Sequence, residues 1–350
     1  MSFQPHQHAP GGRGAAANPK NRFEKLEYVP DPEEETAAIR TQFLRDDSQS
    51  IIVWNESPDI PFRAGLNPYR GCEHGCAYCF ARPTHEYLGF SAGLDFESKI
   101  VVKERAPELL RAEFLKKSWE PQVVAMSGVT DCYQPIERKL ELTRRCLAVF
   151  LEFRNPVAII TKNHLVTRDI DLLSELARHH AVAVNISITT LDADLAKVLE
   201  PRASPPSRRL AAIEALHRAG VPVRVMMAPV IPGLTDHEMP ALLAAAAQAG
   251  ACEACYVPLR LPLAVAPLFE QWLERHAPGH KEKVLNRVRD MRGGKLYDAQ
   301  FGTRMRGEGF LADQMRNLFI LAKRKAGFSG AGAGLSTAGF QAPGSQLELF

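Results

Sequence analysis

The sequence predicts an α/β fold built around an open, partial barrel of parallel strands. Between residues 61 and 265, short β-branched runs alternate with longer amphipathic stretches, an order typical of parallel βαβ units. About six such repeats are present, fewer than the eight of a closed barrel. Several amphipathic stretches also end near Asn155, Gly220 or Gly250, and Asn and Gly commonly terminate helices.

Each element of the barrel is predicted from its own pattern. Strands are expected where short runs are rich in β-branched residues, and helices where apolar residues recur three or four apart. The predicted strands are residues 98–102, 122–126, 157–161, 181–189, 222–228 and 254–259. The predicted helices are residues 106–117, 139–153, 169–179, 206–219 and 236–248.

Four further segments flank the predicted barrel at 61–265. Residues 1–21 are rich in Gly, Pro, Ala, Asn and His, have nothing to bury, and are predicted to be disordered. Residues 22–60 contain one apolar run, 51–54, and are expected to be an extension packed on the core. Residues 266–325 are expected to form a helical C-terminal extension, and residues 326–350 a flexible tail.

The bulk properties exclude several classes of protein. A net charge of +3 over 350 residues does not by itself indicate a nucleic-acid partner. No apolar run is long enough to span a bilayer, so no membrane partner is expected. The first 20 residues are polar and lack the apolar core of a secretory signal, so the expected location is the cytoplasm. The seven cysteines therefore favour a metal or redox site over a disulfide framework.

Three of those cysteines, Cys72, Cys76 and Cys79, follow one another in the spacing C-x3-C-x2-C. Three thiolates so spaced can bind three corners of a cubane iron–sulfur cluster. Gly71 and Gly75 permit the backbone turns that such a loop requires. The fourth iron would keep an open position for an amino and a carboxylate group.

Two other interpretations of this cysteine cluster remain open. A structural zinc site is the first, with His74 or His85 as the fourth ligand. Inert thiols that cluster by chance are the second. The aromatic residue Tyr78 just before the third cysteine, and the position of the cluster ahead of a βα array, favour the iron–sulfur interpretation.

The pattern C-x3-C-x-aromatic-C resembles the signature of the radical S-adenosylmethionine (SAM) superfamily. The resemblance implies a partial (βα)6 barrel, a [4Fe-4S] cluster and SAM as cofactors. It implies an enzyme in which the reduced cluster gives one electron to SAM, so that methionine and a 5′-deoxyadenosyl radical form. A reductant such as flavodoxin or ferredoxin is the implied partner.

A closer resemblance, over residues 60–265, is to the spore photoproduct lyase-like branch of that superfamily. It is carried by residues 127–131, 160–163, 186–189, 200–202 and 227–230. The resemblance implies that SAM contacts lie at the carboxyl ends of the strands. The implied contacts are Tyr78, Thr130, Asp131, Lys162, Ser187, Thr189 and Ala228.

Each implied contact has a role and a structural alternative. Thr130, Asp131, Ser187 and Thr189 offer groups for the SAM amine and ribose, Lys162 for its carboxylate, and Tyr78 and Ala228 for the adenine. The two strand hydroxyls, Ser187 and Thr189, share one face of a strand and could instead be satisfied core groups. Lys162 could be a solvated lysine and Asp131 a helix cap.

The sequence departs from the lyase branch at two positions. That branch has a hydrogen-donating cysteine where this chain has Gly128, and Phe80 lacks a hydroxyl that could relay hydrogen. No reaction is therefore carried over, and the chain resembles a distinct bacterial family related to the lyase. Cys132 is a weak candidate for a catalytic role on the substrate side.

Three weaker signals lie outside the cluster. Cys252 and Cys255 form a C-x-x-C and are expected to be ordinary packed thiols. The basic, Gly-rich stretch 292–307 could contact phosphates or pin the helical extension to the barrel. The C-terminal residues 346–350, from Gln346 to Phe350, resemble the peptide with which bacterial proteins bind the DNA sliding clamp; alternatively, the tail folds back on its own domain.

The leading hypothesis is a radical SAM enzyme of unknown substrate, with DNA as one candidate. A clamp-tethered DNA-binding or scaffold protein with a structural cluster is the first alternative. A structural zinc protein is the second.

Overall fold

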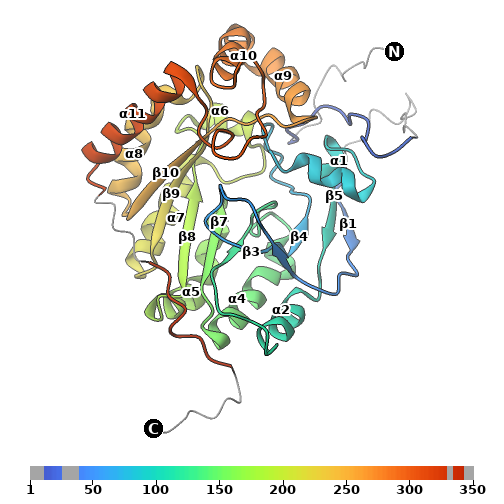
Figure 1. The fold of residues 1–350 in the computed structure, drawn as a ribbon, viewed down its shortest axis with the longest axis vertical. Helices are drawn as coiled ribbons and strands as arrows, with labels where there is room; N and C mark the ends of the chain where they lie inside the picture. Colours follow the sequence, from blue (N-terminus) through green and yellow to red (C-terminus); the bar gives the residue numbers. More distant parts are fainter. Residues whose placement is uncertain (1–11, 26–38, 329–333, 343–350) are drawn as a thin grey trace.

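The computed structural model describes residues 12–25, 39–328 and 334–342 (Figure 1). An open sheet of seven strands lies at its centre. From edge to edge these are β10 (Glu253–Pro258), β9 (Val223–Val230), β8 (Val182–Ser187), β7 (Val157–Thr161), β6 (Val124–Met126), β3 (Ala64–Leu66) and β2 (Ile52–Trp54). All neighbours pair in parallel except β2 and β3. Six parallel strands that do not close confirm the predicted partial barrel.

Helices connect and cover these strands (Figure 1). The helices between β5 and β10 are α2 (Ala106–Phe114), α3 (Glu137–Leu140), α4 (Leu142–Phe153), α5 (Ile170–Arg178), α6 (Ala193–Leu199), α7 (Pro206–Arg218) and α8 (Met239–Gln248). The apolar faces of α2, α4, α5, α7 and α8 join the strands in the main hydrophobic core. These helices therefore form because each buries an amphipathic stripe against the sheet.

One predicted strand belongs to a different sheet. Residues 98–102 contain β5 (Lys99–Val102), which pairs with β1 (Gln42–Arg45) and β4 (Tyr69–Arg70) in a separate three-stranded sheet. The first barrel strand is instead β3, whose three residues are too few to show an alternating pattern. The prediction of residues 98–102 as a barrel strand is therefore wrong.

The predicted helix at 139–153 is interrupted at Glu141, where φ is 51°. The cause is the buried carboxylate of Glu137, which accepts hydrogen bonds from the backbone N–H of Thr143 at 3.1 Å and of Arg144 at 3.4 Å. These bonds satisfy backbone N–H groups in the first turn of α4, so a new helix begins there. A tertiary contact thus overrides a continuous helical pattern.

The N-terminal extension differs from its prediction over residues 12–21. There the chain is packed rather than disordered: the N–H groups of Gly14 and Ala15 donate to the carboxylate of Glu97 at 3.0 and 2.8 Å. Arg13 donates to the Glu97 carbonyl at 2.6 Å. The small side chains of 15–17 leave room for this close approach. Residues 1–11 lie outside the described residues.

The C-terminal extension contains α9 (Val265–His276), α10 (Lys281–Asp290) and α11 (Gly309–Lys325). Residues 334–342 then lie against the barrel, whereas the whole segment 326–350 is predicted to be a flexible tail. The Phe340 ring packs on Phe114 and Phe153, with centroids 6.4 and 6.2 Å apart, and Gln341 N–H donates to the Phe153 carbonyl at 3.0 Å. The sequence resembling a clamp-binding peptide, 346–350, lies outside the described residues. None of the described helices is long and apolar enough to cross a membrane.

Candidate functional site

The three clustered cysteines lie in a loop that follows β4. Cys72 and Cys76 are buried and Cys79 is half-buried. Two tight turns shape the loop, with Gly75 N–H donating to the Cys72 carbonyl at 3.4 Å and Cys79 N–H to that of Cys76 at 3.2 Å. Gly75 has φ +67°, and a Cβ there would lie 2.8 Å from the Glu97 carboxylate. Glycine is therefore required at this turn.

A fully buried ion pair contacts the backbone of this cysteine loop and supports it. Arg82 and Glu97 approach to 2.5 Å, and neither side chain is exposed. The Arg82 guanidinium also donates to the Cys76 carbonyl at 2.8 Å and to the Gly93 carbonyl at 2.9 Å. Because a buried charge is stable only when its partners are in place, this pair fixes the backbone at Cys76.

The surroundings of two of these thiols favour the neutral form over the thiolate. Burial, followed by the nearby charge of Glu200, raises the pKa of Cys76 well above its ordinary value. Burial also raises the pKa of Cys79. Without a cation these thiols are therefore protonated, whereas iron would supply the positive charge that stabilises the thiolates. The chemistry of this donor set fits an iron–sulfur cluster.

The same loop does not offer a zinc site. No three His, Cys, Asp or Glu side chains within the described residues are placed to hold a single metal ion. His74 is paired with Asp131 at 3.3 Å and contacts Asn163 at 3.2 Å, and His85 packs against two phenylalanine rings. Three cluster thiolates need not converge on one point because each binds a different iron.

An ammonium group lies beside the loop at the carboxyl end of β7. Lys162 Nζ donates to Ser187 Oγ at 2.6 Å and to the Ala228 carbonyl at 3.2 Å. It also lies 5.9 Å from the centre of the Tyr78 ring. Among the residues that the structure describes, no carboxylate lies within ion-pair distance of this ammonium group. Its hydrogen-bond partners are neutral, so the ammonium group can donate to the carboxylate of an amino-acid-like ligand and bind it.

Tyr78 connects the cysteine loop to Thr189 and Glu200, which lie on either side of α6 in the sequence. Its hydroxyl lies 3.0 Å from Thr189 Oγ1 and donates to Glu200, which is ion-paired with Arg209. Burial alone would raise the pKa of Glu200, but the charges of Arg209 and Lys162, with hydrogen bonds, lower it to about 2. The hydroxyl of Tyr78 is thus held in the interior, and only the ring remains to border a ligand.

Asp131 is a junction between the loop and the sheet. Its carboxylate accepts hydrogen bonds from Thr161 Oγ1 at 2.8 Å, from the Lys162 N–H at 2.7 Å and from the Tyr133 N–H at 2.9 Å. It also pairs with His74. Burial raises its pKa, but the His74 charge and these hydrogen bonds outweigh burial and lower it. Asp131 therefore orients His74 and the end of β7.

The structure brings most of the predicted site residues together. Lys162, Ser187 and Ala228 form one contact group, Tyr78 and Thr189 a second, and Asp131 joins the first through the Lys162 backbone. Thr130 lies apart, with its hydroxyl donating to the Tyr69 carbonyl at 3.1 Å. Cys132 has no exposed surface and packs in the main core, so the structure gives no support to its role on the substrate side.

Several residues that build the site have no local signal in the sequence. The ion pairs Arg82–Glu97 and Glu200–Arg209 join residues whose separations follow no motif. Of these four residues, the sequence indicated only Glu200, because it lies in the segment 200–202 on which the resemblance partly depends. Buried ion pairs of this kind are recognised only when the fold places both partners together.

An arginine-rich rim borders the half-exposed Phe80. The Arg260 guanidinium carbon lies 4.7 Å from the centre of the Phe80 ring. The loop 292–308 reaches both edges of the open sheet: Arg292 donates to the Leu259 carbonyl at 2.8 Å beyond β10, and Arg304 pairs with Asp59 at 2.6 Å between β2 and β3. The loop thus pins the C-terminal extension to the barrel.

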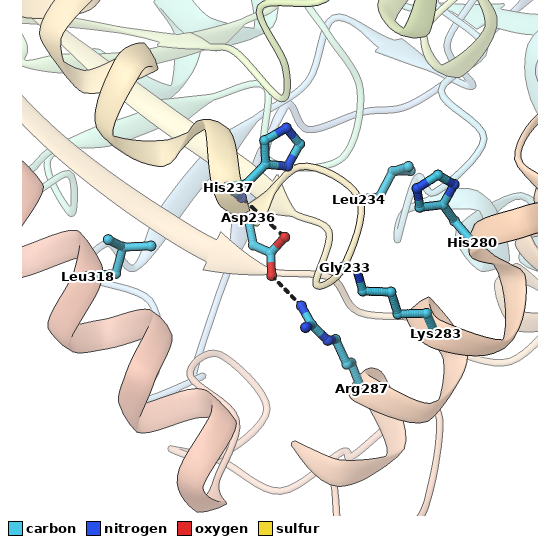
Figure 2. Close-up of a pocket in the computed structure, with 8 residues that line it drawn as sticks. All are labelled: Gly233, Leu234, Asp236, His237, His280, Lys283, Arg287 and Leu318. Atoms are coloured by element: carbon cyan, nitrogen blue, oxygen red, sulfur yellow. Dashed lines mark hydrogen bonds and ion pairs between the residues drawn. The ribbon is translucent and has the colours of Figure 1, made fainter.

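A separate hollow of about 340 Å³ lies between α10, α11 and the loop after β9 (Figure 2). Asp236 and Arg287 pair across it at 2.8 Å, and His237, His280 and Lys283 line it as well. None of the predicted site residues lines this hollow.

Comparison with known protein families identifies sequence relatives. The sequence model of the radical SAM superfamily matches residues 66–246, just over half of the chain. An uncharacterized protein of Mycobacterium tuberculosis is 38% identical over 234 residues, which cover 66% of this chain and 68% of the relative. An uncharacterized protein of Methanocaldococcus jannaschii is 32% identical over 173 residues, covering 49% of this chain and 62% of the relative.

Solved structures share the fold. A spore photoproduct lyase complexed with a dinucleoside spore photoproduct superposes with a TM-score of 0.57 at 14% identity, covering 81% of this chain and 78% of the lyase. A variant of that lyase with bound AdoMet and the same dinucleoside gives a TM-score of 0.56 at 15% identity, covering 81% and 77%.

Proposed function

The chain belongs to the radical SAM superfamily, and we propose that it holds its [4Fe-4S] cluster on Cys72, Cys76 and Cys79 and binds SAM beside Lys162. Members of the superfamily are enzymes that use this cluster together with SAM. One observation carries the assignment of residues: a loop of three clustered thiols lies beside an ammonium group whose described partners are all neutral. Neither the scaffold nor the zinc alternative is favoured.

When bound, the cluster and SAM supply one-electron chemistry that breaks a carbon–sulfur bond of SAM. The residues of the chain prepare the site for it. Lys162 would bind the carboxylate of SAM, and Arg82 with Glu97 holds the cysteine loop in place. Glu200 and Arg209 fix Tyr78, whose ring would border the ligand. Formation of 5′-deoxyadenosine by the reduced protein tests the proposal, and its absence would overturn it.

The proposed substrate is DNA. Support comes from the rim, where Arg260 covers the face of Phe80 at 4.7 Å, an arrangement on which bases can stack and near which phosphates can bind. Further support is that the lyase of similar fold was solved with a dinucleoside photoproduct. Repair of thymine dimers is not proposed, since Gly128 has no thiol and Phe80 no hydroxyl.

Replacing Arg260 with alanine is expected to weaken DNA binding about 10-fold or more, because base stacking contributes roughly 1–3 kcal/mol. Fluorescence anisotropy with a labelled single-stranded oligonucleotide, whose bases are free to stack, measures the effect. The control is Arg178→Ala, which removes an exposed arginine whose one carboxylate partner among the described residues is Glu175 on its own helix. Equal DNA affinity of the Arg260 variant and the control would contradict the proposal, as would a wild-type chain that does not bind DNA.

Binding to the sliding clamp through residues 346–350 is a second proposal and is supported by sequence alone. A peptide that carries the apolar side chains Leu349 and Phe350 suits an apolar pocket. A clamp pull-down should therefore lose the chain when these five residues are deleted, and retention of the shortened chain would refute the proposal.

A further inference from the structure

A pocket of about 750 Å³ is lined by four arginines and by no acidic residue. The loops that follow β6, β7 and β8 form it. Arg138 comes from α3, Arg168 from the 3-10 helix η3 (His164–Asp169), Arg202 from the loop after α6, and Arg208 from the first turn of α7. These four residues define the arginine pocket. The proposed SAM contacts do not line it.

Two of the four charges are not neutralised. Arg168 pairs with Glu137 and with Asp169, each at 2.8 Å, and Arg202 pairs with Glu73 at 3.0 Å. Arg138 and Arg208 are exposed and have no carboxylate partner within the described ranges. The arginine pocket therefore presents excess positive charge to solvent.

Arg208 is held toward the pocket by a neutral neighbour. Its guanidinium donates to His164 Nδ1 at 3.2 Å. Burial, and then the charge of Arg208, lowers the pKa of His164, so the ring stays neutral and accepts this bond. The charge of Arg208 thus remains available to an anionic partner.

The arginine pocket borders the cysteine loop, because two of its lining residues contact Glu73 and His74 of that loop. Arg202 contacts Glu73, and its N–H donates to the His74 carbonyl at 3.2 Å. Asn163, which also lines the pocket, contacts the His74 ring at 3.2 Å. Because Glu73 and His74 lie between Cys72 and Cys76, a partner seated here would be separated from the cysteine loop by only these side chains.

We propose that the arginine pocket is the docking surface for an acidic one-electron carrier protein of the flavodoxin type. The proposal rests on the cluster site proposed above. In the complex one electron leaves the reduced flavin of the carrier and enters the oxidised cluster, so that the carrier is oxidised and the cluster reduced by one electron each, and no covalent bond changes. Complementary charge orients and accelerates such encounters.

The composition of the arginine pocket favours a protein partner over a nucleic acid. No Phe, Tyr or Trp lines it, so the large aromatic faces on which single-stranded nucleic acids stack are missing from this lining. The rim at Phe80 and Arg260 does offer such a face. The two surfaces therefore differ in the chemistry that they present: the arginine pocket has four arginines without a Phe, Tyr or Trp, whereas the rim has an arginine over a phenylalanine ring.

The test uses the full chain with its reconstituted cluster and a flavodoxin as probe. In the double variant Arg138→Glu, Arg208→Glu, the Kd for flavodoxin is expected to rise at least ~10-fold at low salt. Cluster reduction by flavodoxin should slow accordingly, while reduction by dithionite stays unchanged. The matched control is Arg178→Glu, Arg218→Glu, two exposed arginines whose carboxylate partners among the described residues lie within their own helices. A neutral Arg138→Gln, Arg208→Gln variant should show an intermediate Kd.

Three results would overturn the docking proposal. One is a double variant that binds flavodoxin as the wild type does. Another is a wild-type chain that binds neither flavodoxin nor ferredoxin at low salt. The third is a double variant that loses affinity for duplex DNA or for small anions but keeps its affinity for flavodoxin. Failure of the cluster site is distinguishable, because the wild type would then form no 5′-deoxyadenosine even with dithionite, whereas carrier binding can still be measured.

Discussion

Replacing Cys76 with serine is expected to abolish both cluster binding and SAM cleavage. Cys76 is the central cysteine of the loop, and its thiol is buried. Serine keeps the shape of the side chain but is a poor ligand for iron, so one corner of the cluster loses its attachment. Iron and sulfide content, visible absorption and 5′-deoxyadenosine formation measure the loss.

The matched control for this variant is Cys255→Ser, which removes an exposed cysteine from the C-x-x-C at 252–255. It should keep iron content and SAM cleavage at the level of the wild type. Circular dichroism should show that both variants are folded, because the backbone at Cys76 is held by Arg82 rather than by the thiol. Full iron content and full activity in the Cys76 variant would contradict the assigned ligands.

Replacing Lys162 with methionine is expected to weaken SAM binding about 10- to 100-fold, since a hydrogen bond to a charged group is worth roughly 1.5–3 kcal/mol. The cluster should remain in place. Ser187 Oγ also donates to the Ala228 carbonyl at 3.0 Å, so removal of the ammonium leaves this carbonyl with a hydrogen-bond partner. Methionine fills much of the lysine volume, and the free energy of unfolding should therefore change little.

Equilibrium binding of SAM to the reconstituted variant measures this effect. Lys117→Met is the control, because Lys117 is exposed and the substitution changes the net charge equally. A Lys162 variant with wild-type SAM affinity and a normal cluster would show that the ammonium does not bind SAM. Loss of the cluster itself would instead assign Lys162 to the support of the loop.

The barrel was predictable because most of its elements carry local patterns. The predicted strand at 157–161 coincides with β7, and the predicted helices at 169–179 and 206–219 match α5 and α7 within one residue at each end. β3 has only three residues, and the break at Glu141 depends on the distant Glu137 carboxylate. Both were missed because tertiary contacts, rather than local pattern, determine them.

The candidate site was predictable to a similar degree. Lys162, Ser187 and Ala228 were identified by resemblance, and the structure places them in contact. The support of the loop was not predictable, because Glu97 is held by the N-terminal residues 13–15, a segment whose composition indicates disorder. Its small residues pack only because a buried carboxylate offers acceptors for their N–H groups.

The most direct test of the cluster and SAM sites is made on the wild-type chain. The protein is reconstituted anaerobically, reduced with dithionite, and examined by low-temperature electron paramagnetic resonance with and without SAM, while 5′-deoxyadenosine is quantified. We expect iron and inorganic sulfide in equal amounts, a reduced-cluster signal that changes when SAM is added, and 5′-deoxyadenosine formation. A colourless protein that binds zinc through Cys72, Cys76 and Cys79 and forms no 5′-deoxyadenosine would contradict the account.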